Sequence, residues 1–127
     1  MSIVSISLND ESIETLEDIQ KRFGFKGRSE AVRMAINAAK TEAQVIESLE
    51  GMVEGVLIIV KKDHSDPWMN IIQAKHENEI KTQLHSHLRD HKCLEVMVIS
   101  SEAGRLTSML KEIHLTGKAD YVTFVKS

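Results

Sequence analysis

The segment 84–98 restricts the fold of this chain more than any other. His85 and His87 stand two residues apart, and Cys93, the single cysteine, follows six residues after the second histidine. On a strand, residues i and i+2 point to the same face, so the two imidazole rings would lie side by side. If the chain turns over 88–92 and pairs back on itself, Cys93 lies opposite His87, with the Cβ atoms about 4.5–5.5 Å apart. The spacing therefore predicts a hairpin that brings three metal-binding side chains together.

The composition is that of an ordinary globular protein. The 127 residues are 42% hydrophobic and 28% charged, enough for one domain or two small ones. No stretch approaches the roughly 20 apolar residues that span a bilayer, and the N-terminus lacks the features of a signal peptide. We therefore expect a cytoplasmic protein without a membrane partner, in which a reducing environment keeps the cysteine available as a thiolate ligand.

Residues 1–50 are typical of a small strand-helix-helix unit. Residues 3–8 alternate as in a short strand. Asn9 caps a predicted helix that the stretch 23–28 ends, and Ser29 caps a second predicted helix. A single strand leaves its backbone hydrogen bonds unmade, and so small a core is marginal. We therefore predict that the strand pairs with the same strand of a second chain, which makes an obligate homodimer.

Residues 51–127 alternate between strand and helix patterns. The predicted strands and helices, in chain order, are 56–60, helix 67–76, 83–88, 94–100, helix 102–115 and 119–125. This is the β-α-β-β-α-β order of a ferredoxin-like unit. The chain as a whole is predicted to be α+β, with two domains that meet at residue 50.

The histidines indicate that the two domains do different work. Five of the six lie within residues 64–91, and none lies in the first 63. Imidazole nitrogens with one thiolate suit nickel, copper, zinc or cobalt. The alternative is a half-buried strand whose neutral imidazoles find hydrogen-bond partners, and the spacing alone leaves both interpretations open. His64, which lies beside Asp63 and Asp66, is a candidate for a weak second site.

The N-terminal domain also offers residues that suit DNA. Two strands paired antiparallel make a ribbon narrow enough to enter the major groove, and a helix start can hold a phosphate. The candidate DNA-contacting residues are Ile3, Ser5 and Ser7 on the ribbon and Lys26, Arg28 and Ser29 at the helix start. Lys61 and Lys62 are candidates for additional phosphate contact. The alternative is a solvated edge strand. The charge balance favours this alternative, because the first fifty residues contain nine acidic and six basic side chains.

These motifs together resemble one known family. A strand-helix-helix unit followed by a βαββαβ unit with His-x-His-x5-Cys-Leu-Glu resembles the NikR family of nickel-responsive transcriptional regulators. The likeness covers essentially the whole chain and is most specific at 27–33, 84–87 and 93–96. It implies a ribbon-helix-helix domain at 1–50 that forms homodimers and an ACT-type domain at 51–127 that forms homotetramers. It also implies a square-planar nickel site at a subunit interface.

The resemblance implies that His85, His87 and Cys93 come from one subunit and a further histidine from another. The family's fourth ligand usually stands eleven residues before the first histidine of the pair, where this chain has Ala74. His76, nine residues before, is the nearest substitute, and we assign it that role. The family's ribbon usually offers an arginine with two hydroxyl residues, whereas this ribbon offers Ile3 with two serines, so the strongest guanine-reading contact is lost.

We therefore expect a metal-dependent transcription factor and not an enzyme, since no nucleophile–base pair or phosphate loop indicates catalysis. Metal-loaded protein would bind operator DNA more tightly than apoprotein, because metal and DNA binding would be coupled. The alternative is a metal-binding or small-ligand-binding ACT-domain protein with weak or no specific DNA recognition. A sensor of copper, cobalt or zinc on the same scaffold is a further alternative to nickel.

Overall fold

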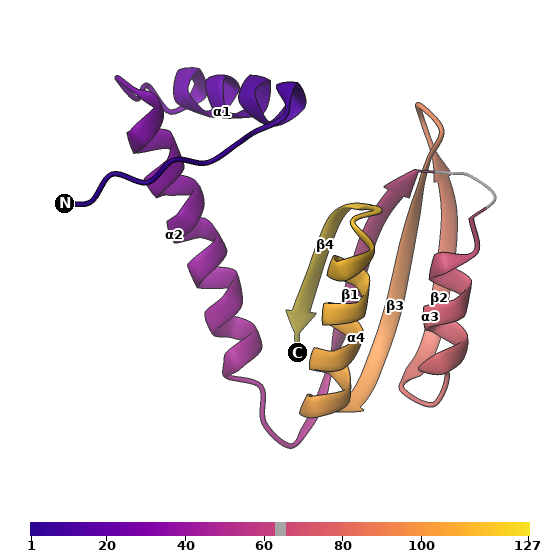
Figure 1. The fold of residues 1–127 in the computed structure, drawn as a ribbon. Coiled ribbons are helices and arrows are strands. Elements are labelled where there is room, and N and C mark those ends of the chain that lie inside the picture. The colour runs from indigo at the N-terminus through magenta and orange to yellow at the C-terminus, as the bar shows by residue number, and fades with distance from the viewer. Residues whose placement is uncertain (63–65) are drawn as a thin grey trace. The chain divides into compact units, whose positions relative to one another are not determined.

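The computed structural model of the chain describes residues 1–62 and 66–127. The chain divides into two compact units, Met1–Ser48 and Leu49–Ser127. The first unit contains two helices, and the second contains a four-stranded sheet with two helices (Figure 1). The weak second metal site considered at His64 lies outside the described residues.

The first unit is built on α1 (Asp10–Arg22) and α2 (Arg28–Glu47). The predicted cap of α1 is confirmed, because the side chain of Asn9 accepts a hydrogen bond of 2.8 Å from the Ser12 amide. The predicted cap of α2 is wrong: Gly27 is its N-cap, and Ser29 lies inside the first turn. Gly27 has extended backbone (φ −150°) and no side chain to cap with, yet glycine is well tolerated at this position.

The strand expected at residues 3–8 is not formed in the single chain. Residues 1–9 are neither helix nor strand, and all of them are exposed. The physical reason is that a strand needs a hydrogen-bonded neighbour, and the described part of this unit contains no second extended segment to provide one. A paired ribbon would therefore require a second chain.

The second unit confirms the predicted βαββαβ order. Its elements, in chain order, are β1 (Met52–Lys62), α3 (Trp68–Lys75), β2 (Ile80–Leu88), β3 (Lys92–Glu102), α4 (Ala103–Thr116) and β4 (Ala119–Lys126). The strands lie in the order β2-β3-β1-β4, and each pair of neighbours is antiparallel. In the part of the chain that the structure describes, no helix has the length and apolar character needed to cross a membrane.

Both helices of this unit cover the same face of the sheet (Figure 1). The core lies between that face and the helices, where α4 contributes Leu106, Met109, Leu110 and Ile113. Alternate residues of β1 are buried against the helices, among them Leu57 and Ile59. The opposite face of the sheet is also apolar but open, and its exposed residues include Leu84, Val98, Tyr121 and Val125.

The hairpin predicted around the histidine pair is confirmed. Strands β2 and β3 are joined by a loop in which Asp90 (φ 60°) and His91 (φ 56°) are left-handed. Asp and His are among the non-glycine residues that adopt this conformation most readily. The resulting register places Cys93 opposite His87, as expected from the spacing.

Candidate metal centre

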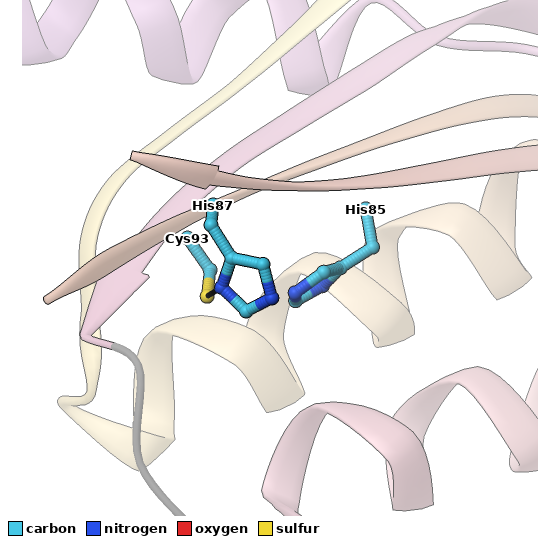
Figure 2. Close-up of side chains that lie close together, drawn as sticks. All are labelled: His85, His87 and Cys93. Atoms are coloured by element: carbon cyan, nitrogen blue, oxygen red, sulfur yellow. Dashed lines mark hydrogen bonds between the residues drawn. The ribbon is translucent and has the colours of Figure 1, made fainter. Parts of the chain in front are cut away.

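Three side chains with metal-binding atoms meet on adjacent strands of the second unit. His85 and His87 extend from β2, and Cys93 extends from β3 toward them (Figure 2). One ligand atom from each residue lies within 4.8 Å of the other two. The Sγ atom of Cys93 is 3.6 Å from the Nδ1 atom of His87. The two imidazole rings are edge-to-face, with centroids 5.0 Å apart.

This arrangement fits a late first-row metal ion. Two ligand atoms that bind one such metal at about 2.0–2.3 Å lie at most about 4.6 Å apart, so the three side chains would move closer together to hold one ion. Cys93 is fully buried, whereas both histidines are exposed. The thiol therefore forms the inner end of the site, and the imidazoles form an outer end that solvent reaches. Two imidazole nitrogens and one thiolate are donors that nickel accepts.

A buried carboxylate orients His85. The Nδ1 atom of His85 contacts Oε1 of Glu95, which lies opposite it on β3. Oε2 of Glu95 accepts a hydrogen bond of 3.4 Å from the side-chain amide of Gln73 on α3. When Nδ1 donates to this carboxylate, the tautomer is fixed and Nε2 keeps its lone pair for a metal. Glu95 therefore orients the candidate ligand His85 and is not itself one of the three candidate ligands.

Sequence reasoning assigned no role to Glu95 or Gln73. For Glu95 the signal was present, because it stands two residues after Cys93 on a strand and so shares its face. For Gln73 there was no such signal, since only the packing of α3 on the sheet brings its amide to Glu95.

His76, the fourth assigned ligand, is not in this cluster. It is the C-cap residue of α3, and only 2% of its surface is exposed. Its Nε2 atom is 3.5 Å from Oε1 of Glu112 on α4. Both ring nitrogens are buried without a normal hydrogen bond to any part of the chain that the structure describes. Ala74, at the family's usual ligand position, is exposed and has no donor atom. Within one chain the structure thus brings together three of the four assigned ligands.

The surroundings of His76 are charged. Lys75 donates a hydrogen bond of 2.8 Å to Glu112, and this bond lowers the pKa of the Glu112 carboxyl below its ordinary value. A hydrogen bond from Arg105 likewise lowers the pKa of Glu79, which outweighs the opposing effect of burial. These ion pairs connect α3 and its following turn to α4.

Lys61, a candidate for phosphate contact, is largely buried, whereas Lys62 is exposed. Lys61 is on the helix-covered face of β1, opposite Cys93 on β3, and is only 7% exposed. This burial makes the expected phosphate contact of Lys61 less favourable than that of Lys62. Lys62 is exposed on the other face of β1, so its expected phosphate contact stays a prediction.

The candidate DNA-contacting residues all lie in the first unit and are exposed. They are Ile3, Ser5 and Ser7 in the N-terminal segment and Lys26, Arg28 and Ser29 around the start of α2. The guanidinium group of Arg28 is bound by Glu17 of α1 at 2.8 Å. The single chain brings the second group together at one helix start, but it does not form the ribbon that would align the first group.

Comparison with known proteins identifies the class of protein. Residues 55–126, more than half of the chain, match the family model described as the NikR C-terminal nickel-binding domain. The chain is also similar to proteins named nickel-responsive regulators. The one from Geobacter metallireducens is 34% identical over 111 residues, covering 85% of this chain and 79% of that protein. The one from Methanococcus maripaludis is 30% identical over 116 residues, covering 89% and 82%.

A third such regulator, from Halobacterium salinarum, is 30% identical over 121 residues, which cover 91% of this chain and 84% of that protein. The chain belongs to the NikR family of nickel-responsive regulators. This confirms the resemblance drawn from its motifs. Nickel is the metal of this family, and the family consists of regulators, not enzymes.

Proposed function

We propose that this chain is a nickel-responsive transcriptional regulator whose metal-loaded form binds operator DNA more tightly than its metal-free form. The observation that carries the proposal is the meeting of His85, His87 and Cys93 on strands β2 and β3. The family assignment identifies nickel as the metal that these donors would hold.

The roles of the three residues follow from their surroundings. Cys93 would bind as a thiolate at the buried end of the site. His85 would bind through Nε2, since Glu95 holds its Nδ1 atom. His87 would complete the set beside the sulfur. By family resemblance a histidine from a neighbouring subunit would be the fourth ligand, and His76 is our candidate for it. A bound nickel ion would supply a fixed link between these groups.

The DNA-binding half of the proposal starts from apolar residues that the single chain leaves uncovered. Val4 and Ile6, which share one face of the predicted strand, are each at least 65% exposed. An open groove of about 460 Å³ lies between the N-terminal segment and the two helices, and it is lined mainly by apolar side chains such as Leu16 and Ile36. A second copy of the same unit would cover these residues and pair the two N-terminal segments.

The paired segments would form a two-stranded ribbon for the major groove. Ile3, Ser5 and Ser7 would then face the bases, while the amides at the start of α2 and the charges of Lys26 and Arg28 would hold the phosphate backbone. Ser29, in the first turn of α2, would add a hydroxyl donor.

Coupling between metal and DNA would arise from quaternary structure. The open apolar face of the C-terminal sheet is a surface for association into a homotetramer. If nickel binds ligands from two subunits, its occupancy favours one tetramer geometry and so fixes the spacing of the two ribbons. A ligand shifts such an equilibrium only through its different affinity for the two states.

The metal half is tested by titrating purified protein with nickel while recording absorption and stoichiometry. Cys93→Ala should lower nickel affinity at least about tenfold, because the thiolate donor is removed. Ser86→Ala is the matched control, since Ser86 stands between the two histidines but on the opposite face of the sheet. An unchanged affinity in Cys93→Ala would contradict the site. A silent His76→Ala would show only that the fourth donor is another group.

The DNA half is tested by fluorescence anisotropy with an inverted-repeat operator, with and without one nickel ion per subunit. We expect tighter binding of the loaded protein. A binding curve that nickel does not change would contradict the proposed regulation even if the metal site is correct.

Two observations favour a second candidate function, a metal sensor without operator recognition. Arg28 is bound to Glu17, and Ile3 replaces the cation that the family's ribbon usually offers. Such a protein would show little salt dependence when it is mixed with random-sequence DNA. A regulator that uses its ribbon and helix termini should show a steep dependence.

A further inference from the structure

We propose that the turn between α1 and α2 packs an aromatic ring, that of Phe23, against the deoxyribose faces of duplex DNA. The inference rests on the proposed function and deepens it, because it adds an apolar contact beside the phosphate contacts assigned to Lys26 and Arg28. This contact would be the same for every DNA sequence, since the sugars along a duplex do not differ from one base to the next.

The first observation is an exposed pair of aromatic rings. The rings of Phe23 and Phe25 are stacked, with centroids 6.0 Å apart and an angle of 19° between their planes. Phe25 is half-buried, whereas Phe23 is 58% exposed. A single exposed ring needs no partner on its own account, so the setting of Phe23 decides what it can bind.

The backbone holds this pair of rings in a fixed position. Phe23 is the C-cap of α1, and Gly24 follows it in the left-handed conformation (φ 70°). The amide of Phe25 donates to the carbonyl of Gln20 at 2.9 Å, and the amide of Gly24 donates to the carbonyl of Lys21 at 3.2 Å. These two bonds are those of a Schellman motif, which ends a helix in a defined geometry. A rigid turn therefore presents the exposed ring, and little conformational entropy would be lost when a partner covers it.

The apolar groove of the same unit does not account for this ring. That groove, which the proposed second copy would fill, is lined by residues such as Leu16, Val32 and Ile36, and Phe23 is not one of its lining residues. A second copy seated in the groove would thus leave the aromatic pair open to another partner.

Basic side chains around the aromatic pair indicate the chemistry of that partner. Residues 21–28 carry four basic side chains and no acidic one, although acidic side chains outnumber basic ones in the first fifty residues. Arg22 and Arg28 each have an acidic partner on α1, whereas Lys21 and Lys26 form no ion pair with any residue that the structure describes. Exposed ion pairs are weak, so all four cations are available to another anion. The turn is a local basic surface that fits a polyanion.

Duplex DNA combines the two features that this surface requires. Its backbone alternates phosphates, which basic side chains hold, with deoxyribose rings, whose C–H faces are apolar. Phe23 precedes Lys26 by three residues and Arg28 by five, so its ring is close to the groups assigned to phosphates. The bases of a duplex are stacked on one another and closed to an aromatic side chain, which leaves the sugars as the contact of the ring.

The experiment measures binding of the full-length, nickel-loaded protein to a fluorescein-labelled random-sequence duplex at several salt concentrations. Phe23→Ser should weaken binding about tenfold, because the ring no longer leaves water on the DNA. This loss should be the same at every salt concentration, since no charge is removed. Lys26→Gln should instead reduce the slope of log affinity against log salt by about one, because a phosphate contact is lost.

Further variants separate the role of the ring from that of its apolar bulk. Phe23→Tyr keeps the ring and should bind DNA within about twofold of the unmodified protein. Val45→Ser is the matched control and should also stay within about twofold, since Val45 is exposed but lies near the opposite end of α2. Far-ultraviolet circular dichroism checks that the helices are retained. If Phe23→Ser loses helix, Phe23→Leu keeps an apolar cover on Phe25 and should still weaken binding about threefold, because its side chain is smaller and not flat.

The outcomes separate this inference from the proposed function. If the unmodified protein binds the duplex with a steep salt dependence but Phe23→Ser binds equally well, the ring makes no contact with DNA and the inference is overturned. If sedimentation equilibrium shows that Phe23→Ser weakens the homodimer, the ring belongs to the interface between copies, which also overturns it. If the unmodified protein has little affinity for DNA at any salt concentration, the DNA half of the proposed function fails as well.

Discussion

The two units of this chain differ in how much of their folding a single copy can complete. In Met1–Ser48 only Ala31 is buried, and Ile3, Ile6 and Ile36 are each at least 60% exposed. In Leu49–Ser127 a sheet and two helices enclose a continuous core. The first unit therefore lacks the buried surface that would offset its loss of chain entropy, whereas the second unit has it.

This difference indicates which part of the proposed function depends on association between chains. In the second unit, a tight hairpin within one chain already assembles three metal-binding side chains. In the first unit, the surface proposed to bind DNA exists only after two copies pair. Under the proposed function, association would be a folding requirement for the N-terminal unit, while for the C-terminal unit it would modify a structure that is already formed.

The largest expected effect tests the independence of the C-terminal core. Leu106 on α4 is fully buried, so Leu106→Ala should lower the free energy of unfolding of this unit by about 2–5 kcal/mol. Leu115→Ala is the control on the same helix, because Leu115 is 86% exposed and its loss should cost within about 0.5 kcal/mol. Urea unfolding followed by Trp68 fluorescence measures both. Equal costs would mean that the core described for one chain is not the one that forms.

The next effect tests the dependence of the N-terminal unit on a partner. Ile36 lines the open groove and is 60% exposed, so Ile36→Asp should leave a single chain almost unaffected but weaken the homodimer at least about tenfold by placing a charge in its core. Ala38→Asp introduces the same charge on the same helix without lining the groove, and its cost in helix propensity is somewhat larger. Sedimentation equilibrium compares the two. Equal association constants would contradict the proposed dimer surface.

The same contrast explains what the sequence could predict. The βαββαβ order and the pairing of His87 with Cys93 follow from local alternation and turn residues, and the structure confirms both. The neighbours of Glu95 could not be predicted, because the packing of α3 brings Gln73 there. The buried position of Lys61 was also missed, since a lysine at a strand end reads as solvated.

The predicted N-terminal strand shows where sequence periodicity fails to predict the structure of a single chain. The alternation of residues 3–8 predicts a strand, yet the single chain leaves this segment without regular structure. Periodicity records what a segment prefers when a partner strand is present, and it does not say which chain provides that partner. Likewise the position of Ala74 showed that a ligand was missing, but only the packing of α4 showed that His76 is enclosed.

A smaller expected effect tests whether DNA binds only to the N-terminal unit. Arg28→Gln should weaken binding to any DNA sequence and reduce the slope of log affinity against log salt by about one, because one phosphate contact is lost. Lys111→Gln removes another exposed cation, on α4 of the other unit, and should change neither quantity. Anisotropy titrations at several salt concentrations measure the slopes. Equal losses in both variants would mean that DNA contact is not confined to the N-terminal unit.

The smallest expected effect concerns acid. The hydrogen bond from Arg105 lowers the pKa of Glu79 in the folded C-terminal unit, and the Glu79 side chain is only 10% exposed. The folded state therefore favours the ionised carboxylate. Its stabilising contribution is complete above the unfolded pKa of about 4.3 and disappears as the pH falls through the lower folded pKa.

Arg105→Gln should accordingly reduce the free energy of unfolding by at most about 1 kcal/mol at pH 7, and the difference from the unmodified protein should vanish at about pH 3. Urea unfolding of metal-free protein, followed through Trp68 at pH 7, 5, 4 and 3, measures this difference. Arg89→Gln, in the exposed loop between β2 and β3, is the control and should show no such pH dependence. The pair of Arg28 with Glu17 in the first unit is much more exposed, at 63% and 47%, so acid should act mainly on the unit that encloses its own core. A pH-independent cost of Arg105→Gln would mean that its packing, and not its charge on Glu79, stabilises the turn after α3.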